Sequence, residues 1–118
     1  MKSKAKPATK AEREHLAAVK SLPCVACSHL GIAGPYVCGP TEAHHLLSGN
    51  KRRGHMFVLP LGSWHHRAVL QGSLTFVGMR ALYGPSLAHG SKPFHAAFGS
   101  DEELLAAVNE LLAQRRAA

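Results

Sequence analysis

Hydrophobic residues near the N-terminus recur at helical intervals. Leu16 and Val19 lie one turn apart, and Thr9 followed by Glu12 has the form of a capping box, in which each residue bonds the main chain of the other. A proline shortly afterwards ends the pattern, since it cannot continue a helix. The spacing predicts a helix over residues 9–21.

A second amphipathic pattern closes the chain. Ser100 and Glu103 form another capping box. The apolar stripe that follows consists of Leu104, Leu105, Val108, Leu111 and Leu112. Residues at this spacing share one helical face, which predicts a helix over residues 100–116.

Between the helices, two short runs have the composition of strands. Residues 56–61 are rich in Phe, Val and Leu, and residues 41–47 have the length of a short strand. The loop that joins them is polar and contains glycines, so the strands should pair antiparallel, with His45 roughly opposite Met56. The pattern therefore predicts an α+β chain built around a hairpin.

Glycine and proline punctuate the remaining segments. Residues 28–40 are rich in both, which predicts a loop before the first strand. After the second strand, Ser63 is placed to cap a helix that Gly72 ends. The apolar residues of segment 73–93 suit either a short strand or a helical turn.

The chain is basic, with a formal net charge of +7 from fourteen Lys and Arg against seven Asp and Glu. Nucleic acid is the usual partner of such a chain, although many basic proteins bind nothing acidic. The candidate phosphate contacts lie in a flexible basic arm over residues 1–8, between the strands and in the following helix. They are Lys2, Lys4, Lys6, Lys51, Arg52, Arg53 and Arg67. Solvated charge is the alternative for the three cations of the loop.

The cysteine count argues against a disulfide framework, because three is an odd number and the N-terminus lacks the apolar segment of a secretion signal. Thiols or metal ligands in a cytoplasmic protein are therefore expected. Apolar runs stay far below the ~18 residues of a membrane span, so a membrane partner is not expected.

Cys24 and Cys27 have the spacing of a zinc knuckle, because two thiolates three positions apart in a tight turn can face one tetrahedral ion. A redox role would need a thioredoxin-like βαβ context, and two ordinary buried cysteines are the remaining alternative. The predicted strand register brings Cys38 beside the helix start that carries His65. These four residues could close a Cys₃His zinc site.

Histidines are concentrated in the middle of the chain, at His44, His45, His55, His65 and His66. Glu42 is the one carboxylate between His15 and Ser100, so a divalent metal bound there must be held almost entirely by imidazole and thiolate. An isolated histidine is usually a surface or core residue with no functional role, and His15 and His29 are assigned to that class.

Phosphodiester hydrolysis needs an activated water, a cation and a group that orients the attack. His44 and His45 point to opposite faces of the strand, so one could bind the cation while the other reaches the phosphate. On the plan of a ββα-metal nuclease, His44 is the ligand and His45 the general base, whose ordinary pKa is near neutral. His66 would complete the metal site, and His55 would orient the base.

These segments resemble the HNH endonuclease superfamily, and most closely the Ref-like recombination-enhancement nucleases of phages. The matching segments are 22–27, 43–46, 54–55, 58–61, 65–67, 86–90 and 94–105. The resemblance implies a ββα-metal (His-Me finger) core, a catalytic Mg²⁺ or Mn²⁺ and a structural Zn²⁺. It also implies DNA cutting that depends on a RecA filament, in a bacterial or phage setting.

The chain departs from that pattern in several places. Gly62 replaces the cysteine that such families usually carry after the second strand, which makes Cys38 its candidate substitute. His55 stands where the superfamily name has its Asn. Residues 71–85 are an insertion, so RecA engagement is not carried over onto them. His89 matches a family histidine whose role stays open between a third metal ligand and a phosphate contact.

The sequence thus predicts one zinc-stapled ββα-metal domain over residues 9–118 with flanking helices. Within it, segments 24–38, 41–72 and 73–93 are the zinc knuckle, the core and an insertion. The predicted function is a metal-dependent DNA endonuclease with little sequence preference. The alternative is a non-catalytic, zinc-stapled DNA-binding module.

Overall fold

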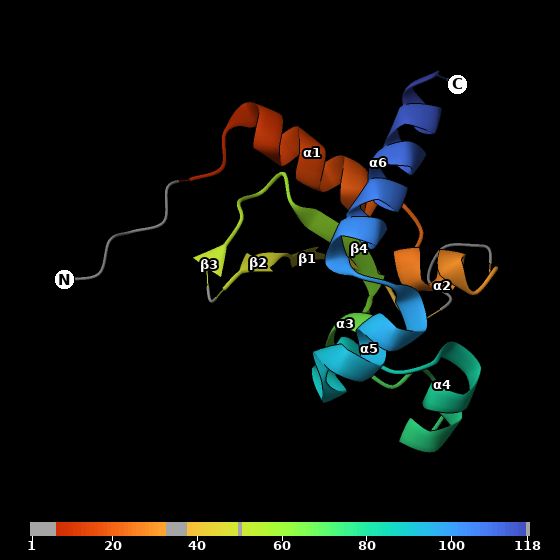
Figure 1. Ribbon diagram of the computed structural model, residues 1–118. Coiled ribbons are helices and arrows are strands. Elements are labelled where there is room, and N and C mark those ends of the chain that lie inside the picture. The colour runs from red at the N-terminus through yellow and green to blue at the C-terminus, as the bar shows by residue number, and fades with distance from the viewer. Residues whose placement is uncertain (1–6, 33–37, 50, 118) are drawn as a thin grey trace.

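The computed structural model describes residues 7–32, 38–49 and 51–117 (Figure 1). Within these ranges it contains α-helices, one 3₁₀ helix and four short strands, so the fold class is α+β. The lysines of the predicted basic arm, Lys2, Lys4 and Lys6, lie outside the described residues. The helices of the described ranges include none that is both long and apolar enough to cross a membrane.

Both terminal helices begin at the predicted capping boxes. In α1 (Lys10–Lys20), the Thr9 hydroxyl accepts from the Glu12 amide at 3.1 Å, and the Glu12 carboxylate accepts from the Thr9 amide at 2.9 Å. The box at Ser100 has the same reciprocal bonds and begins α6 (Asp101–Ala117). Figure 1 shows α6 crossing the central hairpin, with α1 packed nearby.

The central hairpin consists of β1 (Thr41–His45) and β4 (Val58–Gly62), paired antiparallel. His45 lies opposite Val58, so the predicted pairing with Met56 is wrong by two residues. Because side chains alternate between faces with a period of two, an error of two leaves each strand residue on its predicted face.

A smaller hairpin between the two strands causes the shift. β2 (Leu47–Ser48) pairs with β3 (Lys51–Arg52), and the chain then turns before β4. In that turn the Phe57 amide donates to the Gly54 carbonyl at 3.2 Å. The turn at 53–56 adds residues to one side of the hairpin, so the register differs before and after it.

A short helix, α3 (Ser63–Arg67), follows β4 directly. The predicted N-cap at Ser63 and end at Gly72 are both wrong. Gly62 occupies the N-cap position, and the Ser63 hydroxyl accepts a bond from a glutamine side chain at 3.0 Å instead of capping the helix. Ala68 adopts the left-handed conformation, with φ of 59°, and ends the helix early.

The segment whose form the sequence left open is helical. It contains α4 (Phe76–Tyr83) and the 3₁₀ turn η1 (Leu87–His89). The following helix, α5 (Ser91–Phe98), was not predicted, because glycine and proline flank or interrupt it. On the N-terminal side, α2 (Val25–His29) carries part of the cysteine knuckle.

The core lies between the hairpin and the helices. β4 is buried along its whole length. Trp64 of α3 is fully buried, and its Nε1 donates to the Gly84 carbonyl at 3.0 Å. Helices α1, α2, α5 and α6 contribute the apolar side chains of Val19, Val25, Phe94, Phe98, Leu104 and Val108. This packing fixes the hairpin and α3 relative to each other.

Candidate functional site

The three cysteines and one histidine converge in the core. The ligand atoms of Cys24, Cys27, Cys38 and His65 all lie within 4.8 Å of one another, and all four residues are buried. The His65 Nδ1 atom lies 3.2, 3.4 and 3.9 Å from the sulfurs of Cys38, Cys24 and Cys27. A tetrahedral zinc, with Zn–S of ~2.3 Å and Zn–N of ~2.0 Å, would separate N and S by roughly 3.5 Å. The cluster therefore could hold a structural ion such as zinc.

The surroundings of His65 fix which of its nitrogens faces the sulfurs. Its Nε2 lies 2.7 Å from the carbonyl oxygen of Tyr83, which can only accept, so Nε2 carries the proton and donates. The lone pair is then on Nδ1, as a metal ligand requires. Hydrogen bonding to Cys27 and Cys38 lowers the pKa of the Cys24 thiol, which favours the thiolate.

Gly62 makes room for Cys38. A Cβ atom at position 62 would lie 2.1 Å from the Cys38 sulfur, far inside van der Waals contact. The Trp64 amide also donates to the Cys38 carbonyl at 3.0 Å, which holds the two segments together. Cys38 therefore occupies the space that a side chain at position 62 would need, as expected of a substitute for a cysteine there.

A second group of histidines lies on the hairpin and α3. The rings of His44 on β1 and His66 on α3 are 5.1 Å apart between centroids and meet edge to face. Burial lowers the pKa of His44 to about 4, and the neighbouring His66 adds to the effect. His44 is therefore neutral at physiological pH and can offer a lone pair.

Glu42 joins His66 to Arg67. Its Oε1 accepts from His66 Nδ1 at 2.8 Å and from Arg67 Nε at 2.8 Å, and its Oε2 accepts from Arg67 Nη2. The Arg67 hydrogen bonds hold the pKa of Glu42 below its usual range. Since the carboxylate accepts a hydrogen bond from Nδ1–H, the neutral His66 ring presents its lone pair at Nε2. Sequence analysis assigned Glu42 no role, although it was the one carboxylate in that stretch.

His45 and His55 form a bonded pair beside this group. His45 Nε2 and His55 Nδ1 are 3.1 Å apart, so one ring donates to the other. Burial lowers the pKa of His45, and the nearby Arg52 adds to that shift. The structure thus brings the predicted base and its predicted orienting residue into contact.

The corner between α5 and α6 lies beside His44. His95 Nδ1 donates to the Gly99 carbonyl at 2.9 Å, and its Nε2 is 3.5 Å from an oxygen of Asp101. The charge of Asp101 raises the pKa of His44, and that of His95 lowers it. Sequence analysis missed both residues, although they fall within the segment 94–105 that matched the Ref-like pattern.

The predicted phosphate contacts differ in their surroundings. Lys51 and Arg52 are exposed on β3. Arg53 is engaged within the protein, because its guanidinium pairs with Glu102 at 2.5 Å and donates to the Leu47 carbonyl at 3.3 Å. Arg67 is likewise held by the carboxylate described above.

His89 lies away from the hairpin, on the surface formed by α3 and α4. Its ring packs against Phe76, with centroids 4.6 Å apart, and against Trp64 at 6.2 Å. These contacts are those of a surface aromatic. The described contacts of His89 include none with His44 or His66.

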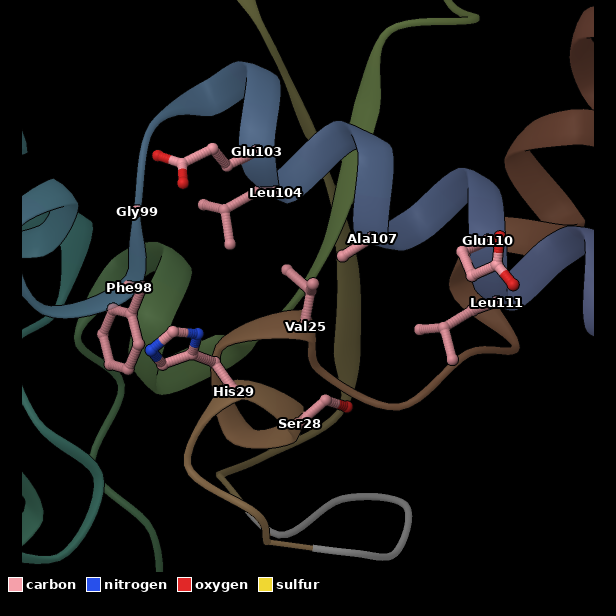
Figure 2. A pocket seen from close by; sticks show the side chains of 10 residues that line it. All are labelled: Val25, Ser28, His29, Phe98, Gly99, Glu103, Leu104, Ala107, Glu110 and Leu111. Carbon is pink, nitrogen blue, oxygen red and sulfur yellow. The ribbon is translucent and has the colours of Figure 1, made fainter.

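A cavity away from the hairpin histidines lies between α2 and α6 (Figure 2). It encloses about 350 Å³ and is mostly apolar, with His29 facing Phe98 at one end and Glu103 and Glu110 along α6. The predicted site residues within the described ranges lie outside its lining.

Comparison with known families identifies the chain. The sequence model of the family described as "Recombination enhancement, RecA-dependent nuclease" matches residues 8–113. The match covers most of the chain, which therefore belongs to this family. The resemblance to Ref-like nucleases is confirmed, and the chain has a nuclease role in recombination. No curated protein matches the chain at a significant level.

Proposed function

We propose that the chain is a metal-dependent endonuclease of the HNH type that hydrolyses DNA phosphodiester bonds with little sequence preference. The observation that carries the proposal is the approach of His44 and His66, from a strand and the helix after the hairpin, with ring centroids 5.1 Å apart. A ββα-metal core is expected to have a hairpin followed by a helix, with imidazoles from both, so this approach supports the proposal.

His44 and His66 are the proposed ligands of a Mg²⁺ or Mn²⁺ ion. Bound there, the ion would supply stabilisation of the charge that develops on the phosphate and the leaving oxygen. The donor set fits, because burial keeps His44 neutral and Glu42 leaves His66 with a free Nε2 lone pair. Imidazole ligands suit transition metals, so Mn²⁺ should support cutting at least as well as Mg²⁺.

His45 is the proposed general base. In the tautomer that suits this role, His45 Nε2–H donates to His55 Nδ1 at 3.1 Å. His45 Nδ1 then accepts a proton from the attacking water, and His55 holds the ring in place as it becomes charged. Because burial lowers the pKa of His45, the neutral base form predominates at neutral pH.

The remaining parts of the proposal concern structure and partners. The buried Cys₃His cluster serves as a closed structural zinc site. The exposed Lys51 and Arg52 and the lysines of the N-terminal arm grip DNA phosphates without reading sequence. The family name implies dependence on RecA. On this proposal the chain acts as a single domain over residues 9–118, and a RecA filament in the bacterial cytoplasm presents the DNA to it.

The test is cutting of supercoiled and single-stranded DNA with Mg²⁺ or Mn²⁺, in the presence and absence of RecA and ATP. His45→Ala should abolish cutting, with a loss of at least about 100-fold, since a positioned general base contributes roughly 10²–10⁴ in rate. DNA affinity and melting temperature should stay close to those of the wild type.

His29→Ala is the matched control, because His29 is exposed and lies at the α2–α6 cavity instead of the hairpin. It should cut at the wild-type rate. An unchanged rate in His45→Ala would end the catalytic assignment. Binding without cutting under every condition would favour the zinc-stapled DNA-binding module.

A further inference from the structure

A groove of about 340 Å³ lies along β1, and the side chain of Lys20 lines it. The proposed reaction assigns this lysine no role. It is lined by Leu16 and Lys20 of α1, by residues 41–43 and His45 of β1, and by His66 of α3. The volume is at the low end of the range of ~300–1,000 Å³ for ligand sites. His45 and His66, one from each proposed reactive pair, therefore line the same groove as Lys20.

The main chain at Lys20 is held firmly. Its neighbour Val19 is fully buried, and Leu22, two positions on, is 3% exposed. The Thr41 hydroxyl donates to the Leu22 carbonyl at 3.1 Å, which ties the end of α1 to the start of β1. The lysine side chain is exposed, so a rigid backbone presents a long, solvated cation beside the groove.

The charge of Lys20 is not neutralised by the groove's own carboxylate. Both oxygens of Glu42 are occupied by His66 and Arg67. Among the described residues, the ion pairs within 4.0 Å leave Lys20 without a carboxylate partner. Lys20 and His45 line the same groove. The groove is thus positive at its α1 wall, which suits an anion.

We propose that Lys20 binds a phosphate of the cut strand next to the scissile phosphate, and so holds that strand in the groove along β1. This inference rests on the proposed nuclease function. An ammonium group is a compact point charge that binds phosphate oxygens well without reading bases. With one phosphate fixed at Lys20, the next along the strand would face His45 and His66, which line the same groove.

The experiment measures DNA binding by the full chain without divalent cation, as a function of salt. Each phosphate contact contributes about 0.9 to the slope of log K against log salt for duplex DNA and about 0.7 for a single strand. Lys20→Gln should lower the slope by about one contact, and Lys20→Arg should keep it. In cutting assays, Lys20→Gln should raise KM more than it lowers kcat, because the contact exists before the reaction.

Lys10→Gln is the matched control. Lys10 is exposed at the other end of the same helix, about 15 Å away at 1.5 Å per residue. It should leave the slope unchanged. Melting temperatures of the variants detect any loss of folding, which would not by itself change a salt slope.

The two proposals fail differently. Equal slopes for the wild type, Lys20→Gln and Lys10→Gln, in a chain that cuts DNA, would overturn the contact and leave the nuclease function standing. A chain that never cuts would overturn the nuclease function, whereas a reduced slope for Lys20→Gln in that chain would still place a phosphate at Lys20.

Discussion

Glu42 organises the candidate site although it is not a proposed ligand. It lies on β1 two residues before His44, on the same strand face, and receives hydrogen bonds from His66 and Arg67 of α3. A carboxylate that bonds the far nitrogen of a ligating histidine fixes the tautomer and makes the ring a better donor. A single residue thus connects the strand and the helix that the metal site needs.

Glu42→Gln should weaken the catalytic metal site and leave the zinc cluster intact. Loss of such a partner typically costs 10–100-fold in metal affinity. The Mg²⁺ concentration for half-maximal cutting should therefore rise by roughly 10–100-fold, with zinc content unchanged. Metal titration of the cutting rate measures the first quantity, and metal analysis the second.

Glu14→Gln is the control for this change, since Glu14 is exposed on α1. It should leave the metal titration unaltered. If the Mg²⁺ concentration for half-maximal cutting is the same for Glu42→Gln and Glu14→Gln, the Glu42 carboxylate does not support His66 as a metal ligand.

Residue type and spacing predicted the zinc cluster but not the supporting residues. A Cys-x-x-Cys pair by itself indicates a zinc knuckle. Gly62 stands where such families usually carry a cysteine, which made Cys38 the candidate replacement ligand. Glu42 and Lys20 carry no such signal, because their partners lie in other elements. Their roles depend on how α1 and α3 pack against β1, and this packing could not be predicted from the sequence alone.

At the scale of elements, the two reciprocal capping boxes were reliable, whereas the single N-cap signal at Ser63 and the strand register were not. The reciprocal bonds at Thr9 and Ser100 are local, so the sequence was sufficient to predict the starts of α1 and α6. The pairing of β1 with β4 depends on a small hairpin and a turn between them, whose extra residues leave no hydrophobic pattern. Helix α5 was missed because Pro93 lies within it.

α1 packs against the hairpin through a histidine that is poorly satisfied. His15 Nε2 is buried without a hydrogen-bond partner among the described residues. Burial lowers the pKa of His15, the main chain at Met56 raises it, and the charge of Arg116 lowers it. The net direction is downward, so the folded chain binds this proton less readily than the unfolded chain.

This shift predicts a loss of stability in acid that His15→Leu should reduce. As pH falls below the ordinary histidine pKa of ~6.5, the unfolded state takes up the proton first, so the free energy of unfolding decreases until the lower folded pKa is reached. The melting temperature of His15→Leu should therefore fall less than that of the wild type between pH 8 and pH 5. At pH 8 the variant should melt at or above the wild-type temperature, since an unpartnered buried nitrogen costs about 1–3 kcal/mol.

His29→Leu provides the comparison, because His29 is exposed on α2. Its melting temperature should follow the wild-type dependence on pH. Parallel pH profiles for the wild type and His15→Leu would contradict the assignment of acid sensitivity to the α1–hairpin contact.

At the scale of the whole molecule, the Cys₃His cluster joins segments that are far apart in the chain. Cys24 and His65 are separated by 41 positions, and Cys38 comes from the loop before β1. Without an ion, three thiols and an imidazole would be buried together in the core, with no metal to satisfy their polar atoms. A domain of this size has a modest core, so a metal bound at the cluster would contribute a large share of its stability.

Removing the metal should therefore unfold the chain and not merely inactivate it. Structural zinc sites bind with apparent free energies of about 10–16 kcal/mol, which equals or exceeds the ~5–15 kcal/mol stability of a typical domain. Chelation should abolish the cooperative melting transition, and Zn²⁺ but not Mg²⁺ should restore it.

Cys24→Ser should contain about one zinc fewer per chain and lose the transition, whereas Ser28→Ala, on the same short helix as Cys27, should retain both. A metal-free chain that melts at the wild-type temperature would show that apolar packing alone holds the hairpin to α3, and the histidine groups would then owe their geometry to the core and not to the cluster.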